Sequence, residues 1–144
     1  MVTIRTAHPS DAETISELLT SLGYTGTRPF IRDRIAQLLD HPDEKLLVAS
    51  NGANVIGVLS LHFIPQLALA RDFCRISYFC VDESARGAGT GAALEAQATE
   101  LAQIRGCDRI EVHCHARRVD AHRFYARQGY TESPKYLVKS LIEV

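Results

Sequence analysis

The chain has 144 residues, of which 46% are hydrophobic and 23% are charged. This composition is typical of one soluble globular domain over residues 1–144 and excludes a disordered chain. Its 16 Lys and Arg residues and 17 Asp and Glu residues give a net charge of −1. Proteins that bind nucleic acid usually carry an excess of basic residues, so we expect no nucleic-acid partner. No apolar run approaches the ~18 residues of a membrane span, and no basic segment followed by an apolar one opens the chain. We therefore expect a cytoplasmic protein with no membrane partner and no secretory signal.

The first half of the sequence predicts a strand, two helices and a β-hairpin. Ser10 as N-cap and Glu13 three residues later resemble a capping box, and Gly23 ends the apolar helical pattern that follows. Asn51-Gly52 is a strong hairpin signal because both residues tolerate a positive φ. The expected elements are a strand at Val2–Ala7, helices at 10–23 and at Thr27–Asp40, and strands at Lys45–Ser50 and Asn54–Phe63.

The second half predicts strands alternating with helices. The expected elements are a strand at Cys74–Val81, a long helix from about Gly89 to Arg105, a strand at Arg109–His115, a short helix at Asp120–Gln128 and a last strand at Tyr136–Ile142. Hairpins imply antiparallel neighbours, whereas a strand–helix–strand segment needs a parallel crossover. We therefore predict an α/β fold of the α+β type, with a mixed, mostly antiparallel sheet of about six to seven strands and helices on both faces.

The four cysteines do not predict a metal site. None of Cys74, Cys80, Cys107 and Cys114 forms a C-x-x-C pair. Cys114 lies between His113 and His115, but neighbours on a strand point to opposite faces, so the three side chains could not share one ion. We expect no metal and reduced, mostly buried thiols.

A glycine-rich stretch between a predicted strand and a predicted helix carries the chemical signal. Arg86-Gly87-Ala88-Gly89-Thr90-Gly91 lets backbone N–H groups converge at a helix N-terminus, where anions bind, and Arg86 adds a positive charge. This pattern favours a pyrophosphate site, with a plain glycine-rich turn as the alternative. A P-loop requires Lys and then Ser or Thr after its last glycine, and it is excluded because Ala92 and Ala93 follow Gly91. A dinucleotide-binding fingerprint requires G-x-G-x-x-G near the chain start, and it is disfavoured because the spacing here is G-x-G-x-G and four predicted strands precede it.

Two motifs in order resemble the GNAT superfamily of N-acetyltransferases. Residues 86–91 resemble its R/Q-x-x-G-x-G/A motif, and Ala121 to Tyr130 (A-H-R-F-Y-A-R-Q-G-Y) resembles its A-x-x-F-Y-x-x-x-G-F/Y motif. The opening strand and helix, and the closing Tyr136 to Leu141, fit the same family, so the resemblance covers nearly the whole chain. Arg118 stands where many members have Asn, as in a subgroup with R-x-x-A-H-x-F-Y.

The resemblance implies a fold and a reaction. It implies that the chain binds acetyl-CoA as cosubstrate and moves its acetyl group directly to a primary amine. Its cofactor-binding residues would be Phe79, Cys80 and Val81 on the strand, Arg86, Gly87, Ala88, Gly89, Thr90 and Gly91 in the turn, and Arg118, Phe124 and Tyr125 in the second motif. A backbone N–H of Phe79 or Cys80 would stabilise the thioester oxygen, and Tyr125 would protonate the departing thiolate.

The general base stays open. The family often has Glu or His at positions that are Arg75 and Ser77 here, and neither is a base. His113 and His62 are the leading catalytic candidates, since histidine titrates near neutral pH. His115, Asp72 and a relay of water molecules are the alternatives.

The acceptor also stays open. A small-molecule amine, an aminoglycoside and a peptide or protein amine all fit the sequence, and the resemblance implies a homodimer. The absence of a base at Arg75 and Ser77 motivates a non-enzymatic alternative, an acyl-CoA sensor or interaction module on the same fold. A nicotinamide-dependent oxidoreductase is a weaker third hypothesis.

Overall fold

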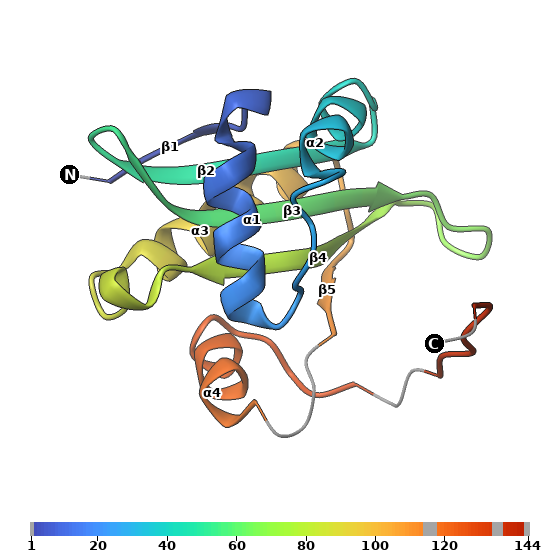
Figure 1. Cartoon of the computed structure of the whole chain (residues 1–144). Coiled ribbons are helices and arrows are strands. Elements are labelled where there is room, and N and C mark those ends of the chain that lie inside the picture. The colour runs from blue at the N-terminus through green and yellow to red at the C-terminus, as the bar shows by residue number, and fades with distance from the viewer. Residues whose placement is uncertain (1, 114–117, 134–136, 143–144) are drawn as a thin grey trace. The chain divides into compact units, whose positions relative to one another are not determined.

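The protein forms two compact units, Met1–His113 and Cys114–Val144. In the computed structural model (Figure 1), residues 2–113, 118–133 and 137–142 are described. The first unit contains a sheet with helices, and the second contains one helix and the C-terminal segment. Each unit is described by itself, and a single domain over 1–144 stays a prediction.

The sheet of the first unit has its five strands in sequence order (Figure 1). The first four pair antiparallel with one another, and the fifth pairs parallel with the fourth. The predicted mixed, mostly antiparallel sheet is therefore confirmed. The strands are β1 (Val2–Thr6), β2 (Glu44–Asn51), β3 (Asn54–Ile64), β4 (Phe73–Val81) and β5 (Ile110–Val112).

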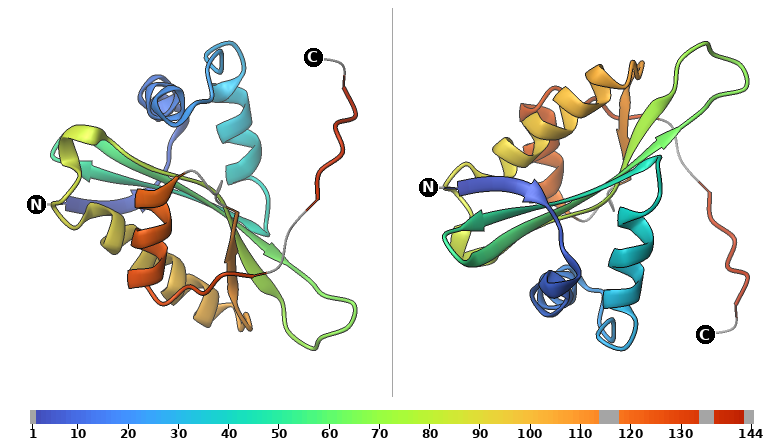
Figure 2. Two further views of the ribbon diagram at one scale, coloured as in Figure 1. Left: turned by 90° about the horizontal axis from the view of Figure 1, so that it is seen from below. Right: turned by 90° about the horizontal axis from the view of Figure 1, so that it is seen from above.

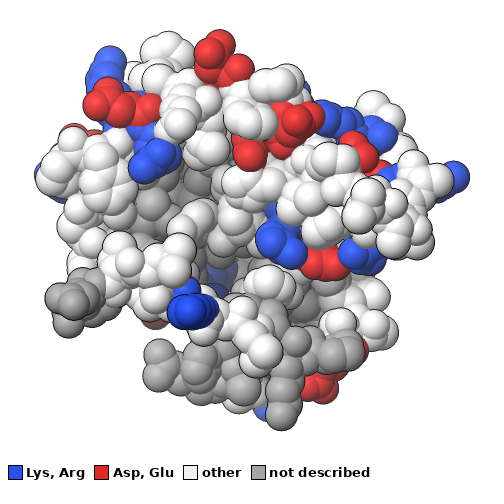
Figure 3. Space-filling model, turned by 90° about the vertical axis from the view of Figure 1, so that its right-hand side faces the viewer, with Lys and Arg blue, Asp and Glu red and all other residues white. Residues whose placement is uncertain are grey.

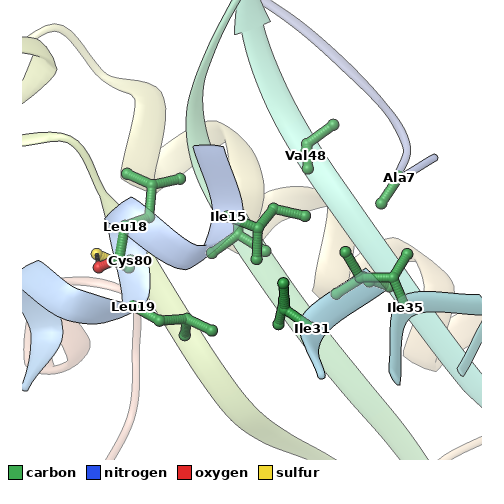
Figure 4. Packing of buried hydrophobic residues seen from close by; sticks show 10 residues of the cluster. Ala7, Ile15, Leu18, Leu19, Ile31, Ile35, Val48 and Cys80 are labelled. Atoms are coloured by element: carbon green, nitrogen blue, oxygen red, sulfur yellow. Dashed lines mark hydrogen bonds between the residues drawn. The ribbon is translucent and has the colours of Figure 1, made fainter. Parts of the chain in front are cut away.

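Helices cover both faces of this sheet, as predicted (Figure 2). Helices α1 (Ala12–Leu22) and α2 (Ile31–Leu39) lie on one face, and α3 (Thr90–Ile104) lies on the other. In Figure 4, α1 and α2 direct apolar side chains such as Ile15 and Ile35 toward the strands. Ile15 and Ile35 are 2% and 1% exposed, so this apolar contact holds the two helices on the sheet.

The first helix begins differently from the sequence prediction. A short 3-10 helix, η1 (Pro9–Asp11), precedes α1, and its capping box joins His8 and Asp11 rather than Ser10 and Glu13. The carboxylate of Asp11 accepts the His8 backbone N–H at 2.8 Å and two guanidinium N–H groups of Arg5 at 2.8 and 2.9 Å. These bonds hold the pKa of Asp11 below its ordinary value. Pro9 at the first helical position favours this earlier start.

Two β-bulges change which residues face one another in the sheet. Between β2 and β3 the register shifts at Ala49 and Ser50. Between β3 and β4, Ser60 pairs with Tyr78 while Leu61 pairs with Ile76, so Ser77 is the extra residue. A bulge re-aims side chains and increases local twist, and both bulges affect the site described below.

The predicted number of six to seven strands is wrong, because the described residues form a sheet of five. Residues 137–142, which belong to the predicted last strand, form no strand. A strand requires ladder partners, and no described residue pairs with this segment; Leu137 and Leu141 are accordingly exposed. Strand β5 covers only Ile110–Val112 of the predicted Arg109–His115, whose last two residues, like Tyr136, lie outside the described residues.

The cysteines of the first unit are free thiols. Cys74 and Cys80 are buried, and Cys107 is half-buried; Cys114 lies outside the described residues. Burial raises the pKa of the Cys74 thiol to about 12. In the described part of the chain, no group of three or more metal-ligating side chains is present, and no helix has the length and apolar character that crossing a membrane requires.

Candidate active site

The predicted pyrophosphate turn lies between β4 and α3. A short 3-10 helix, η2 (Glu83–Ala85), leads into it, and Gly87 and Gly89 take left-handed φ values of 84° and 83°. A Cβ atom at either glycine would meet nothing within 4 Å, so the outer surface of the turn is open to a ligand. The Thr90 hydroxyl at the start of α3 is buried and has no hydrogen-bond partner among the described residues. Left-handed glycines before a helix N-terminus form a backbone concavity that suits an anion.

Strand β4 continues beyond its pairing with β5. The described ladder joins Cys74–Ile76 to Ile110–Val112 and ends there, whereas β4 continues to Val81. The Cys80 thiol is buried and donates to the Leu18 carbonyl at 3.3 Å, so its side chain faces the core. Only the main chain of Cys80 is therefore left for a ligand beside β4.

A carboxylate, an imidazole and a hydroxyl form a chain across β2, β3 and β4. The bulge between β2 and β3 sets Glu44 opposite His62, and Nδ1 of His62 forms an ion pair with the Glu44 carboxylate. On the other side of the ring, Nε2 lies 2.5 Å from Oγ of Ser77, the extra residue of the β4 bulge. The His62 and Glu44 side chains are 28% and 15% exposed. The carboxylate therefore fixes an imidazole that is still open to solvent.

This chain borders an open pocket of about 460 Å³. His41 and Arg75 line the same pocket. One terminal nitrogen of Arg75 binds Glu111 at 3.2 Å, but its Nε is buried and has no hydrogen-bond partner among the described residues. Although burial raises the pKa of Glu111, hydrogen bonds from Arg109 and Arg75 hold it below its ordinary value. The pocket thus offers a histidine and a hydroxyl, with the Arg75 guanidinium at its wall.

Acidic and basic side chains lie intermixed on the face shown in Figure 3. Among the ion pairs of the first unit, Arg105 pairs with Asp43, which lines the pocket, and Arg109 pairs with Asp108 and Glu111. Arg105 also lies over the Phe63 ring, with 4.6 Å between its guanidinium carbon and the ring centroid. The charges around the pocket are thus largely paired with one another.

The other predicted site residues belong to other elements of the chain. His113 is exposed and directly follows β5. In the second unit, Arg118 is the exposed N-cap of helix α4 (Val119–Arg127), which carries Phe124 and Tyr125. The Tyr125 ring packs edge-on against Phe124 and Tyr130, with 5.3 Å between the centroids of each pair. His115 lies outside the described residues.

The sequence interpretation missed the partners of His62. Neither Glu44 nor Ser77 was expected to contact it. A β2–β3 hairpin without a bulge would place Leu61, not His62, opposite Glu44. The signal available was the short hairpin itself, which brings the start of β2 close to the end of β3. The one-residue shift that aligns Glu44 with His62 was not visible in the sequence.

Comparison with known proteins identifies the family. The family model described as "Acetyltransferase (GNAT) family" matches residues 12–130. An aminoalkylphosphonate N-acetyltransferase of Salmonella typhimurium is 34% identical over 110 residues, which are 76% of this chain and 71% of the relative.

Two solved structures illustrate the likeness in fold. A transcriptional regulator from Bacillus halodurans superposes with a TM-score of 0.89 at 27% identity, over 98% of this chain and 100% of the other. Glucosamine-6-phosphate N-acetyltransferase from Arabidopsis thaliana superposes with a TM-score of 0.86 at 19% identity, over 99% of each chain. The family match and the curated relative together show that this chain belongs to the GNAT family and is an N-acetyltransferase.

Proposed function

We propose that the protein transfers an acetyl group from acetyl-CoA directly to a primary amine. The observation that carries this proposal is the turn at Arg86–Gly91, in which two left-handed glycines directly precede helix α3. The diphosphate of the cosubstrate would bind the backbone N–H groups of this turn, with Arg86 beside it. The thioester arm would lie along β4 beyond Ile76, where the described β5 ladder has ended.

His62 acts as the general base in this proposal. A primary amine of pKa ~10.4 is neutral in only about one molecule in 2,500 at pH 7, so its proton must be removed before it attacks. His62 lines an open pocket, and the contact of its Nδ1 with Glu44 fixes the ring with Nε2 toward Ser77. The amine proton would reach Nε2 directly or through the Ser77 hydroxyl. His113 stays the alternative base.

Tyr125 acts as the general acid. Its match to the family motif supports this role, and a phenol with a pKa of about 10 stays protonated at pH 7 and can donate to the thiolate. The backbone N–H of Phe79 or Cys80 would stabilise the developing negative charge on the thioester oxygen.

The acceptor is a small amine or a peptide amine. The Salmonella relative is named for aminoalkylphosphonates, so an aminoalkylphosphonate is the first amine to test, followed by aminoglycosides and peptides with a free amino terminus. A homodimer and a cytoplasmic location stay predictions.

The experiment incubates the protein with acetyl-CoA and each amine, and measures free thiol and acetylated amine together. We expect equal amounts of both products, above the amine-free background, for at least one amine. No acetylated amine, and no thiol release above that background with any amine, would contradict the proposal.

The base is tested by the pH profile of a His62→Gln variant. The variant should be roughly 100-fold slower than the wild type at pH 7, and its rate should keep rising toward the pKa of the amine. His8→Gln is the control, since His8 is exposed at η1. Equal profiles for His62→Gln and wild type would exclude His62 and favour His113.

A further inference from the structure

The Glu44–His62–Ser77 chain has the connectivity of a nucleophilic serine site. A serine hydroxyl is a weak nucleophile until a base accepts its proton, and the base is most effective when a third group orients it. Here Ser77 Oγ lies 2.5 Å from Nε2 of His62, and Glu44 pairs with the opposite ring nitrogen. The order carboxylate, imidazole and hydroxyl is therefore complete within one pocket.

One tautomer of His62 lets the Ser77 hydroxyl donate to the imidazole. When Glu44 accepts the proton on Nδ1, the Nε2 atom of a neutral ring carries a lone pair. Ser77 has a second acceptor, the Ser60 carbonyl, but that oxygen lies farther away, at 3.3 Å. Both acceptors are within reach of the hydroxyl, and a ring with its proton on Nδ1 accepts the Ser77 proton at Nε2.

A positive charge lies at the wall of the same pocket. Arg75, His62 and Ser77 all line it, and one terminal nitrogen of Arg75 binds Glu111 at 3.2 Å. The guanidinium charge favours a developing negative oxygen in the pocket. Ser77 itself is half-buried and is the extra residue of the β4 bulge, a feature that re-aims a side chain.

We propose that Ser77 is an acyl-accepting nucleophile, which takes an acetyl group from a thioester and gives it to water when no amine is bound. Ser77 Oγ attacks the thioester carbon while its proton moves to His62, and the carbon–sulfur bond breaks as the thiolate takes that proton. Water then attacks the serine ester, its proton passes through His62 to Oγ, and acetate leaves. This activity rests on the proposed function for its donor, acetyl-CoA, but it uses no amine.

The first test uses p-nitrophenyl acetate, an activated ester that does not need the CoA site. The wild-type protein should release a burst of p-nitrophenolate and gain one acetyl group, which peptide mapping should place on Ser77. Ser77→Ala should abolish the burst, and Glu44→Gln should slow it roughly 100-fold. A label mapped to another residue, or a burst that persists in Ser77→Ala, would overturn the proposal.

The chain provides a matched control in a second serine–histidine pair. Ser10 Oγ lies 2.9 Å from Nδ1 of His8 on an exposed segment outside the pocket, and Asp11 accepts the backbone N–H of His8. Ser10→Ala should therefore keep the full burst. Because the label is mapped on the wild-type protein, the result does not depend on whether any variant folds.

The second test uses acetyl-CoA without amine, together with a calorimetric titration of CoA. Slow thiol release that is lost in Ser77→Ala would support the proposal. Tight CoA binding with amine acetylation, but with no acetyl group on Ser77 from either donor, would overturn it and leave the N-acetyltransferase proposal intact. If CoA does not bind at all, the proposed function fails, and the ester experiment alone decides the role of Ser77.

Discussion

Replacing Gly89 by alanine should weaken CoA binding at the pyrophosphate turn while lowering the stability of the protein only modestly. Gly89 has a φ of 83°, which costs an L-residue roughly 1–2 kcal/mol, and an added Cβ would meet nothing within 4 Å. The variant should therefore fold with a modest loss of stability. The Cβ would stand on the open side of the turn, where the diphosphate must approach the backbone closely. We expect about a tenfold weaker CoA affinity, equivalent to about 1.4 kcal/mol.

Gly106→Ala is the matched control for this experiment. Gly106 follows α3, has a φ of 79° and also leaves open space for a Cβ, so its strain should match that of Gly89. Thermal melts should show similar losses for both variants, while calorimetric titration should show weaker CoA binding only for Gly89→Ala. Equal CoA affinities in the two variants would refute the assignment of this turn to the diphosphate.

Three further predictions follow from named side chains. Tyr125→Phe should lower turnover far more than it weakens CoA binding, and an unchanged turnover rate would remove its acid role. Asp11→Asn should destabilise the protein by about 1 kcal/mol at neutral pH. Arg5 lowers the folded-state pKa of Asp11. The contribution of Asp11 to stability is therefore complete above the unfolded pKa of ~3.9 and is lost as the pH falls through the folded pKa. Urea titrations at several pH values should show the stability difference between wild type and Asp11→Asn shrinking in that range, and a difference independent of pH would contradict this account. Leu94→Ala should cost about 3 kcal/mol in urea unfolding because Leu94 is fully buried, whereas Leu67→Ala, on an exposed loop, should cost less than about 0.5 kcal/mol.

Local signals predicted most of the first unit. The Asn51-Gly52 turn joins β2 and β3, and the helix expected from Gly89 to Arg105 is observed as Thr90–Ile104. These features depend on residues close together in sequence, such as the positive φ at Gly52 and Gly89. Periodicity and turn chemistry therefore suffice to predict them.

Features that depend on distant partners were not predictable in the same way. The β4 bulge at Ser77 and the β2–β3 register shift bring Glu44, His62 and Ser77 together, and no local pattern marks either. The alternation at 137–142 predicted a strand, but a strand exists only where a neighbouring edge accepts its hydrogen bonds. Sequence thus indicated His62 as a candidate base, while the partners that orient it came from the fold.

The most direct test of the central claim is a stoichiometric assay of acetyl transfer with an aminoalkylphosphonate as the first amine. With acetyl-CoA in excess, the account predicts one acetylated amine for each thiol released above the amine-free background. If CoA binds but no amine in the panel becomes acetylated, direct transfer to an amine is contradicted and the protein is better described as an acyl-CoA-binding module.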